Sequence, residues 1–149
     1  MPISTAGEKK DLVRQIDPKM RYILDSDWII NLLAGKKDAT EYIQRFDPDE
    51  IVISIITVAE ISESAFNYAN PEEHMKVFRS FFENFHLLTL NLPIVEKFAE
   101  IRAYLRRRGA MISDFDMLLG ATALHYKLTV LTHNKKHFQC IPDIKIYQP

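Results

Sequence analysis

One stretch, residues 112–138, constrains the fold of this chain more than any other. It opens with Asp114 and Asp116, acids of the kind that favour the start of a helix, and continues as an apolar segment with small residues. A run at residues 128–132 then predicts a strand that leaves through the polar side chain of Asn134. In open α/β sheets, helix N-termini and strand C-termini lie at one edge, where ligands bind. The stretch therefore predicts a site at such an edge.

The rest of the chain alternates between the same two kinds of segment. Proline and glycine mark several boundaries, because proline favours a first helical turn and glycine a helix end. The pattern predicts strands at 21–25, 51–54, 86–90 and, at a sheet edge, 144–147, and helices at 27–37, 38–46, 57–69, 71–85 and 93–109. This alternation predicts an α/β fold of three layers, with helices on both faces of a mainly parallel central sheet.

Two segments divide the chain unequally. Residues 1–19 are polar and form an N-terminal extension, in which residues 9–16 could form a short helix. Residues 20–149 have the length and apolar content of one globular domain, since 47% of the whole chain is hydrophobic. We therefore expect one folded domain preceded by an extension.

The composition limits the classes of partner and compartment. With 19 basic and 20 acidic side chains the net charge is −1, so no overall field attracts nucleic acid or an anionic membrane. Cys140 is the only cysteine, which excludes an internal disulfide and a thiolate zinc cluster. No apolar run approaches the roughly 18 residues that a membrane span needs. We expect a soluble protein of the cytoplasm that does not contact a membrane.

Acidic and amide side chains recur where the predicted strands and helices meet. Asp25 ends the first strand, and Glu60 lies in the first turns of the helix that follows the second. If the strands are parallel, these two side chains approach the same edge as Asp114, Asp116 and Asn134. Carboxylates gathered in one cleft repel one another unless a cation neutralises them, and oxygen ligands select hard ions. The cluster predicts a site for Mg²⁺ or Mn²⁺.

Capping offers a simpler explanation for some of these acids. Glu60 and Asp116 each follow a threonine or serine by three residues, the spacing of a capping box. Asp25 has no such explanation, because aspartate is disfavoured in strands. Asp114 and Asp116 lie about 200° apart around a helix, so both face one metal only if Asp114 belongs to a frayed first turn. The five histidines show no paired metal spacing, and His133 alone falls near the predicted site.

At this point the sequence resembles a known family. The segments RYILDSDWII, ITVAEI and ISDFDMLLGATALHYKLTVLTHNKKHF are similar in order and spacing to the PIN-domain nucleases, especially the toxins of VapBC toxin–antitoxin pairs. The resemblance runs from about Met20 to the C-terminus. It differs in the N-terminal extension, in Asp27 where asparagine is common, and in the amide of Asn134, which should weaken a second metal position.

The resemblance implies a function. The chain would be a metal-dependent endoribonuclease that hydrolyses RNA, tRNA included, and it would form a homodimer held inactive by an antitoxin protein. Residues matching Asp25, Glu60 and Asp116 would bind Mg²⁺ or Mn²⁺, with Asn134 completing the catalytic set. Asp25 and Asp116 would hold the ion, while Glu60 and Asn134 would complete its shell or orient the attacking water.

Two alternatives stay open on the sequence alone. A haloacid-dehalogenase-like phosphatase also begins with a strand and Asp-x-Asp, as in Asp25 and Asp27, with Ser54 in place of its later serine or threonine. The chain lacks that class's later lysine and paired acids in suitable order. The other alternative is a PIN-like module that binds RNA or protein without cleaving. RNA cleavage, turnover of small phosphate esters, or neither would separate the three.

Overall fold

Five short strands form one sheet in which every neighbouring pair is parallel. A computed structural model describes residues 16–149. The strands lie in the order β3-β2-β1-β4-β5, so β5 is at an edge as predicted. Their bounds are β1 Tyr22–Leu24, β2 Ile51–Ser54, β3 His86–Leu88, β4 Thr129–Leu131 and β5 Lys145–Ile146. The prediction of a mainly parallel sheet is confirmed, and the sheet is parallel throughout.

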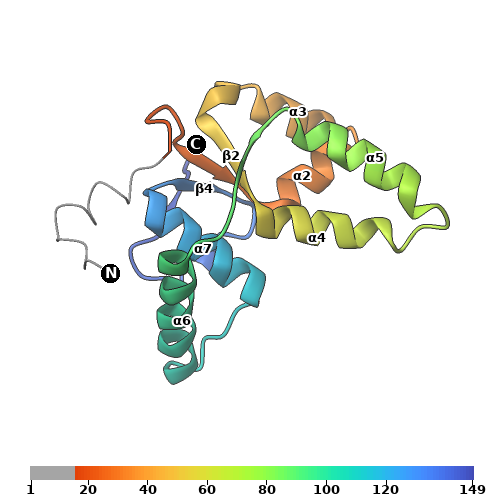
Figure 1. Cartoon of the computed structure of the whole chain (residues 1–149). Coiled ribbons are helices and arrows are strands. Elements are labelled where there is room, and N and C mark those ends of the chain that lie inside the picture. The colour runs from red at the N-terminus through yellow and green to blue at the C-terminus, as the bar shows by residue number, and fades with distance from the viewer. Residues whose placement is uncertain (1–15) are drawn as a thin grey trace, which may run out of the picture.

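Helices cover both faces of the sheet (Figure 1). On one face, Ile23, Val52 and Val130 pack with buried side chains of α6 and α7. On the other, Leu24 and Leu131 pack with side chains of α2 to α5. The helices are α2 Ser26–Leu33, α3 Lys37–Ile43, α4 Ile55–Ala65, α5 Pro71–Phe82, α6 Leu92–Arg107, α7 Asp114–Tyr126 and the short α8 Lys135–Phe138, with a 3-10 turn η1 at Pro48–Glu50. The predicted three-layer α/β fold is confirmed.

Neighbouring side chains of a strand point to opposite faces of a sheet, and this explains the two cores. Ile23 is fully buried on one face and Leu24 on the other. Strands buried on both faces have continuous apolar runs, as β2 does. A polar side chain can therefore occur first where such a strand ends, because the residues within the strand are buried on one face or the other.

Helix boundaries differ from the predicted ones by a few residues, and one helix was missed. Helix α4 begins at Ile55 rather than at residue 57, because the Ser54 hydroxyl accepts the Ile56 N–H and caps the helix earlier. The four-residue α8 is too short to show a periodic pattern. Residues 1–15 lie outside the described part of the chain, so the extension and its short helix stay predictions.

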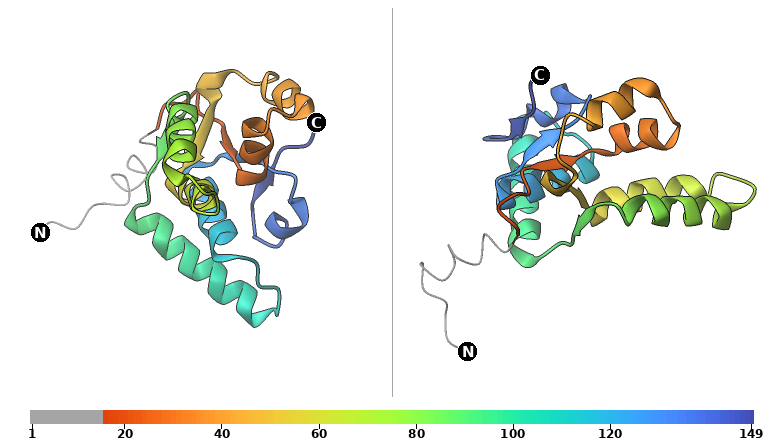
Figure 2. Two further views of the ribbon diagram at one scale, coloured as in Figure 1. Left: turned by 90° about the vertical axis from the view of Figure 1, so that its right-hand side faces the viewer. Right: turned by 90° about the horizontal axis from the view of Figure 1, so that it is seen from above.

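Two further features bear on function. Helices α4 and α5 lie side by side and extend away from the sheet (Figure 2). Three large apolar side chains of α5 and of the segment between the two helices are exposed, namely Phe66 (69%), Tyr68 (52%) and Val77 (58%). Within residues 16–149, no helix combines the length and the apolar character that a membrane span requires.

Candidate active site

Asp25 stands at the carboxyl end of the central strand β1, in a buried position. Its Oδ1 accepts the Ser26 N–H at 2.8 Å and its Oδ2 accepts the Thr132 hydroxyl at 2.7 Å. Only 4% of the residue is exposed. A carboxylate has about four acceptor positions, and these two bonds leave lone pairs available on both oxygens. Asp25 is thus held in one orientation while keeping the capacity to bind a cation.

Burial and neighbouring charge both disfavour ionisation of Asp25. Its pKa is raised from 3.8 to about 6, chiefly by burial and then by the negative charges of Asp27 and Asp116, against the opposing hydrogen bonds. The pKa of Glu60, on α4, is raised from 4.5 to about 7, again chiefly by burial and then by Asp25 and Asp116. Three carboxylates from β1, α4 and α7 therefore influence one another at this edge of the sheet.

Asp116 and Asn134 are connected through a histidine. The side chain of Asp116 is 14% exposed, and its Oδ2 lies 3.3 Å from His137 Nδ1. The same imidazole nitrogen lies 2.6 Å from Asn134 Nδ2. Asn134 follows the end of β4 by three residues. We interpret it as part of the cluster because its amide lies beside the imidazole that also reaches Asp116.

Asp114 is not brought to the cluster. Its Oδ1 accepts the Arg102 Nε–H at 3.1 Å, and its side chain is 62% exposed. The 200° between positions 114 and 116 of a helix separates the two carboxylates, since α7 is regular from Asp114 onward. A frayed first turn, which the ligand role of Asp114 requires, is absent from α7.

Asp27 and the aromatic rings beside it hold helix α2 and the segment after β4 together. Asp27 Oδ1 accepts the Trp28 N–H at 2.7 Å and Oδ2 accepts the His133 N–H at 2.9 Å. The His133 ring stacks on Trp28 at 3.6 Å between centroids, and Tyr42 stacks on Trp28 at 3.8 Å. Asp27 therefore links α2 to the segment that follows β4. This structural role explains why an acid occupies position 27, and the catalytic role that a phosphatase would give it is not needed.

The structure gives different answers on helix capping by Asp116 and by Glu60. The Ser113 hydroxyl accepts the Asp116 N–H at 3.1 Å and caps α7, but the Asp116 carboxylate accepts no backbone N–H among the described residues, so only the serine half of the capping box is present. Thr57 lies inside α4 rather than at its start, and its buried hydroxyl has no hydrogen-bond partner among the described residues. A capping box does not account for Glu60.

The donor set fits a hard divalent cation. Asp25, Glu60 and Asp116 offer carboxylate oxygens, the ligands that Mg²⁺ and Mn²⁺ prefer, and their charges lie close enough to raise pKa values. As they stand, no group of three or more His, Cys, Asp or Glu side chains within residues 16–149 is arranged to hold a metal ion. The three carboxylate side chains would have to rotate toward one another to coordinate an ion together.

Two residues at this site were missed in the sequence. Thr132 is buried and holds both Asp25 and the Asn134 N–H, at 2.7 and 2.9 Å. His137 touches Asp116, whereas the sequence placed only His133 near the site. The signal for His137 was its spacing of three residues from Asn134, which places both on one side of a helical turn.

The chain is similar to proteins of a known family. Residues 22–142 match the family model described as "PIN domain". Ribonuclease VapC1 of Haemophilus influenzae (strain R2866) is 30% identical over 128 residues, covering 85% of this chain and 96% of that protein. The tRNA(fMet)-specific endonuclease VapC of Salmonella typhimurium is 25% identical over 127 residues, with the same two coverages.

A solved structure agrees as well. The DNA-bound VapBC structure from Salmonella typhimurium superposes with a TM-score of 0.79 at 25% identity, covering 86% of this chain and 97% of that one. The family match spans most of the chain, and the phosphatase alternative is set aside. The chain belongs to the PIN-domain family and, within it, to the VapC ribonuclease toxins of toxin–antitoxin pairs.

Proposed function

We propose that the protein hydrolyses RNA phosphodiester bonds with Mg²⁺ or Mn²⁺ held by Asp25, Glu60 and Asp116. The observation that carries this proposal is the mutual influence of three carboxylates from separate elements, two of them with pKa values raised to about 6 and about 7. Charges so arranged destabilise the metal-free protein, and a divalent cation would relieve them.

The roles of the individual residues follow from their surroundings. Asp25, fixed by Ser26 and Thr132, is the anchoring ligand, and Asp116 is the second. Glu60 is partly exposed, so it can reach a water molecule and orient it for attack on phosphorus. Bound by these carboxylates, Mg²⁺ or Mn²⁺ would lower the pKa of a water molecule and offset the negative charge that develops on the phosphate group. His137 Nδ1 lies near both the Asn134 amide and the Asp116 carboxylate; when protonated it donates to Asp116 and helps to orient that ligand, with Asn134 beside it.

Asp114 serves another purpose in this proposal. Its ion pair with Arg102 links the start of α7 to α6, and we leave it out of the ligand set. The chemistry therefore depends on Asp25, Glu60, Asp116 and Asn134.

The substrate and partners follow from the relatives. The Salmonella relative is named for tRNA(fMet), so we take tRNA as the first substrate to test. Solved VapBC complexes support an antitoxin partner for this chain. The exposed apolar side chains Phe66, Tyr68 and Val77 support protein contacts on the α4–α5 hairpin, including a homodimer. The cytoplasm, where tRNA is found, is the proposed compartment.

Cleavage of tRNA(fMet) by the purified protein tests the proposal. Wild type is incubated with Mg²⁺, Mn²⁺ or EDTA beside Asp25→Asn and Asp116→Asn, with Asp114→Asn as a matched control on the same helix start. We expect metal-dependent cutting that both site variants lose and the control keeps. Equal cutting by wild type and Asp25→Asn would refute the site. Absence of cutting after antitoxin removal would favour the module that binds without cleaving.

A further inference from the structure

Three aromatic rings form a continuous stack beside the carboxylates. Tyr42 stacks on Trp28 with 3.8 Å between ring centroids, and Trp28 stacks on His133 with 3.6 Å. Trp28 is 9% exposed, whereas the His133 side chain is 45% exposed, so the stack ends at the surface. Among residues 16–149, no other aromatic ring stacks on His133. Because Trp28 covers one face of the imidazole, the exposed area belongs to the opposite face and to the ring edge.

His133 lies at the edge of the sheet that carries the carboxylates. It follows β4 and stands between Asn134 and Thr132, whose hydroxyl donates to Asp25 Oδ2 at 2.7 Å. Asp27 Oδ2 lies 3.5 Å from His133 Nδ1 and 3.4 Å from the Thr132 hydroxyl. A short chain of polar contacts thus connects the imidazole to the Asp25 carboxylate, and the exposed end of the stack adjoins the proposed active site.

The imidazole is held in place by three contacts. Besides stacking on Trp28, His133 donates its backbone N–H to Asp27 Oδ2 at 2.9 Å, and its Nδ1 lies 3.5 Å from the same oxygen. A half-exposed side chain that changes rotamer freely loses this freedom when a ligand binds to it, and the loss weakens binding. Because the His133 ring is already fixed, a flat group that stacks on its outer face causes little further loss of conformational entropy.

The surroundings of His133 favour a ligand group that is neutral and flat. Asp25 and Asp27 make this part of the edge acidic, so it repels phosphate groups except where a cation neutralises the carboxylates. A nucleobase carries no charge, and the bases of single-stranded RNA stack on aromatic side chains, histidine included. A paired base is already stacked within its own helix, so the base that His133 can receive is an unpaired one.

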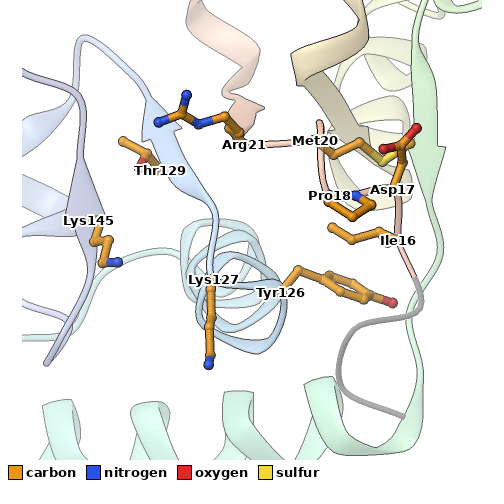
Figure 3. Close-up of a pocket in the computed structure, with 9 residues that line it drawn as sticks. All are labelled: Ile16, Asp17, Pro18, Met20, Arg21, Tyr126, Lys127, Thr129 and Lys145. Atoms are coloured by element: carbon orange, nitrogen blue, oxygen red, sulfur yellow. The ribbon is translucent and has the colours of Figure 1, made fainter. Parts of the chain in front are cut away.

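The opposite edge of the sheet is arranged differently. Its pocket, of about 340 Å³, is lined by Arg21, Lys127 and Lys145 among others, and in Figure 3 their charged ends point away from one another. Side chains that diverge in this way do not hold one ligand group together. The stacked rings beside the carboxylates, in contrast, present one fixed flat surface.

We propose that the outer face of His133 is the stacking site for an unpaired nucleobase of the substrate RNA, next to the phosphate held at the carboxylates. This site presupposes the proposed ribonuclease function, and it adds the requirement for an unpaired nucleotide beside the bond that is cut. His133 binds and positions the substrate through its ring face, while Trp28 and Tyr42 support the ring from behind.

Two substitutions separate stacking from mere covering of Trp28. His133→Leu covers Trp28 with an apolar side chain but has no aromatic face, whereas His133→Phe keeps that face and loses the ring nitrogens. His74→Leu is the matched control, because His74 stacks on Tyr68 with 3.7 Å between centroids in the α4–α5 hairpin, which extends away from the sheet (Figure 2). Urea unfolding checks that every variant of the full chain is folded.

Binding is measured in EDTA, so that no cleavage is required. The probes are a fluorescein-labelled 12-nucleotide single-stranded RNA and an abasic ribose-phosphate chain of the same length, both followed by anisotropy. We expect His133→Leu to bind the RNA at least about fivefold more weakly than wild type, the lower end of what one base–aromatic stack contributes. His133→Phe and His74→Leu should stay within about twofold of wild type, and all four proteins should bind the abasic chain alike.

Two further readouts locate the contact. In NMR spectra, the imidazole Cε1–H resonance of His133 should shift upfield when RNA is added, because the ring current of a stacked base acts on it, and that of His74 should not shift. His133→Leu identifies the signal by its loss. With tRNA in Mg²⁺, His133→Leu should raise KM by a larger factor than it lowers kcat, because the stack binds substrate and transition state alike, and His133→Phe should restore KM.

Four results would overturn the stacking site. They are RNA binding by His133→Leu equal to that of the control, RNA binding by His133→Phe as weak as that of His133→Leu, wild-type binding of RNA no tighter than of the abasic chain, and an unshifted His133 resonance in the RNA-bound protein. Because the binding measurements require no cleavage, RNA binding through His133 without cutting in Mg²⁺ would refute the proposed function alone. Cutting of tRNA together with normal RNA binding by His133→Leu would refute the stacking site alone.

Discussion

Replacing Asp25 by asparagine should stabilise the metal-free protein at pH 7 while abolishing cleavage. The pKa of Asp25 is about 6 in the folded protein against 3.8 for an unperturbed aspartate. This difference of about two pH units corresponds to about 3 kcal/mol of unfavourable free energy when the carboxyl is ionised. An asparagine side chain does not ionise, so Asp25→Asn removes this cost.

The sign depends on pH in a defined way. Between about pH 4 and pH 6 the folded state holds the Asp25 proton and the unfolded state has lost it, so this group's contribution to stability falls as pH rises through that window. Below pH 4 both forms are neutral and the cost disappears. The stabilising effect of Asp25→Asn should therefore be present at pH 7 and absent at about pH 3.5.

One hydrogen bond limits the gain. The amide nitrogen of asparagine cannot accept the Thr132 hydroxyl, which donates to Asp25 Oδ2 at 2.7 Å. That hydroxyl can turn toward Asp27 Oδ2, 3.4 Å away, and we assign about 1 kcal/mol to the exchange. The net expectation is a gain of about 1–2 kcal/mol at pH 7 and a loss of about 1 kcal/mol at pH 3.5.

Urea unfolding in EDTA at the two pH values measures the effect. Asp114→Asn is the matched control, because its exposed ion pair should contribute within about 0.5 kcal/mol. Adding Mg²⁺ at pH 7 should stabilise wild type and leave Asp25→Asn almost unchanged. A variant that is destabilised equally at both pH values would show that the Asp25 charge is not the unfavourable group we infer.

Three further substitutions test separate contacts. Thr132→Val should raise the Asp25 pKa above 6 and destabilise the metal-free protein by about 1–3 kcal/mol at pH 7, measured by carboxyl NMR titration and urea unfolding; an unchanged pKa would contradict this. Gly120→Val should cost about 1–3 kcal/mol in thermal unfolding, because a Cβ there would lie 2.5 Å from Ile141 Cδ1, and wild-type stability would refute this packing. Lys127→Gly should gain up to about 1 kcal/mol by relieving the left-handed backbone, whereas Lys127→Ala should not; equal effects would disprove the strain.

The strands and their parallel arrangement could be predicted from local pattern. Strands buried on both faces have continuous apolar runs, and Ile51, Val52 and Ile53 of β2 are an example. Asp25 stood out because it directly follows such a run, where a carboxylate is partly buried. A buried charge requires a binding partner or a functional role. The prediction that the acids gather at one edge of the sheet required only that all the strands are parallel.

The contacts at the site were decided by tertiary structure. Sequence spacing favoured Asp116 as a ligand and admitted Asp114 only in a frayed first turn, and the packing of α7 on α6 paired Asp114 with Arg102 instead. Thr132 and Asp25 are 107 residues apart, and they meet because β1 and β4 are neighbours in the sheet.

The sequence by itself determined the α/β class and most of the acidic set, because apolar periodicity and the chemistry of each side chain are local properties. The tertiary structure decided which acids share an environment and how strongly burial raises their pKa values. Those properties depend on strand order and on distances between residues far apart in the chain, which no local pattern records.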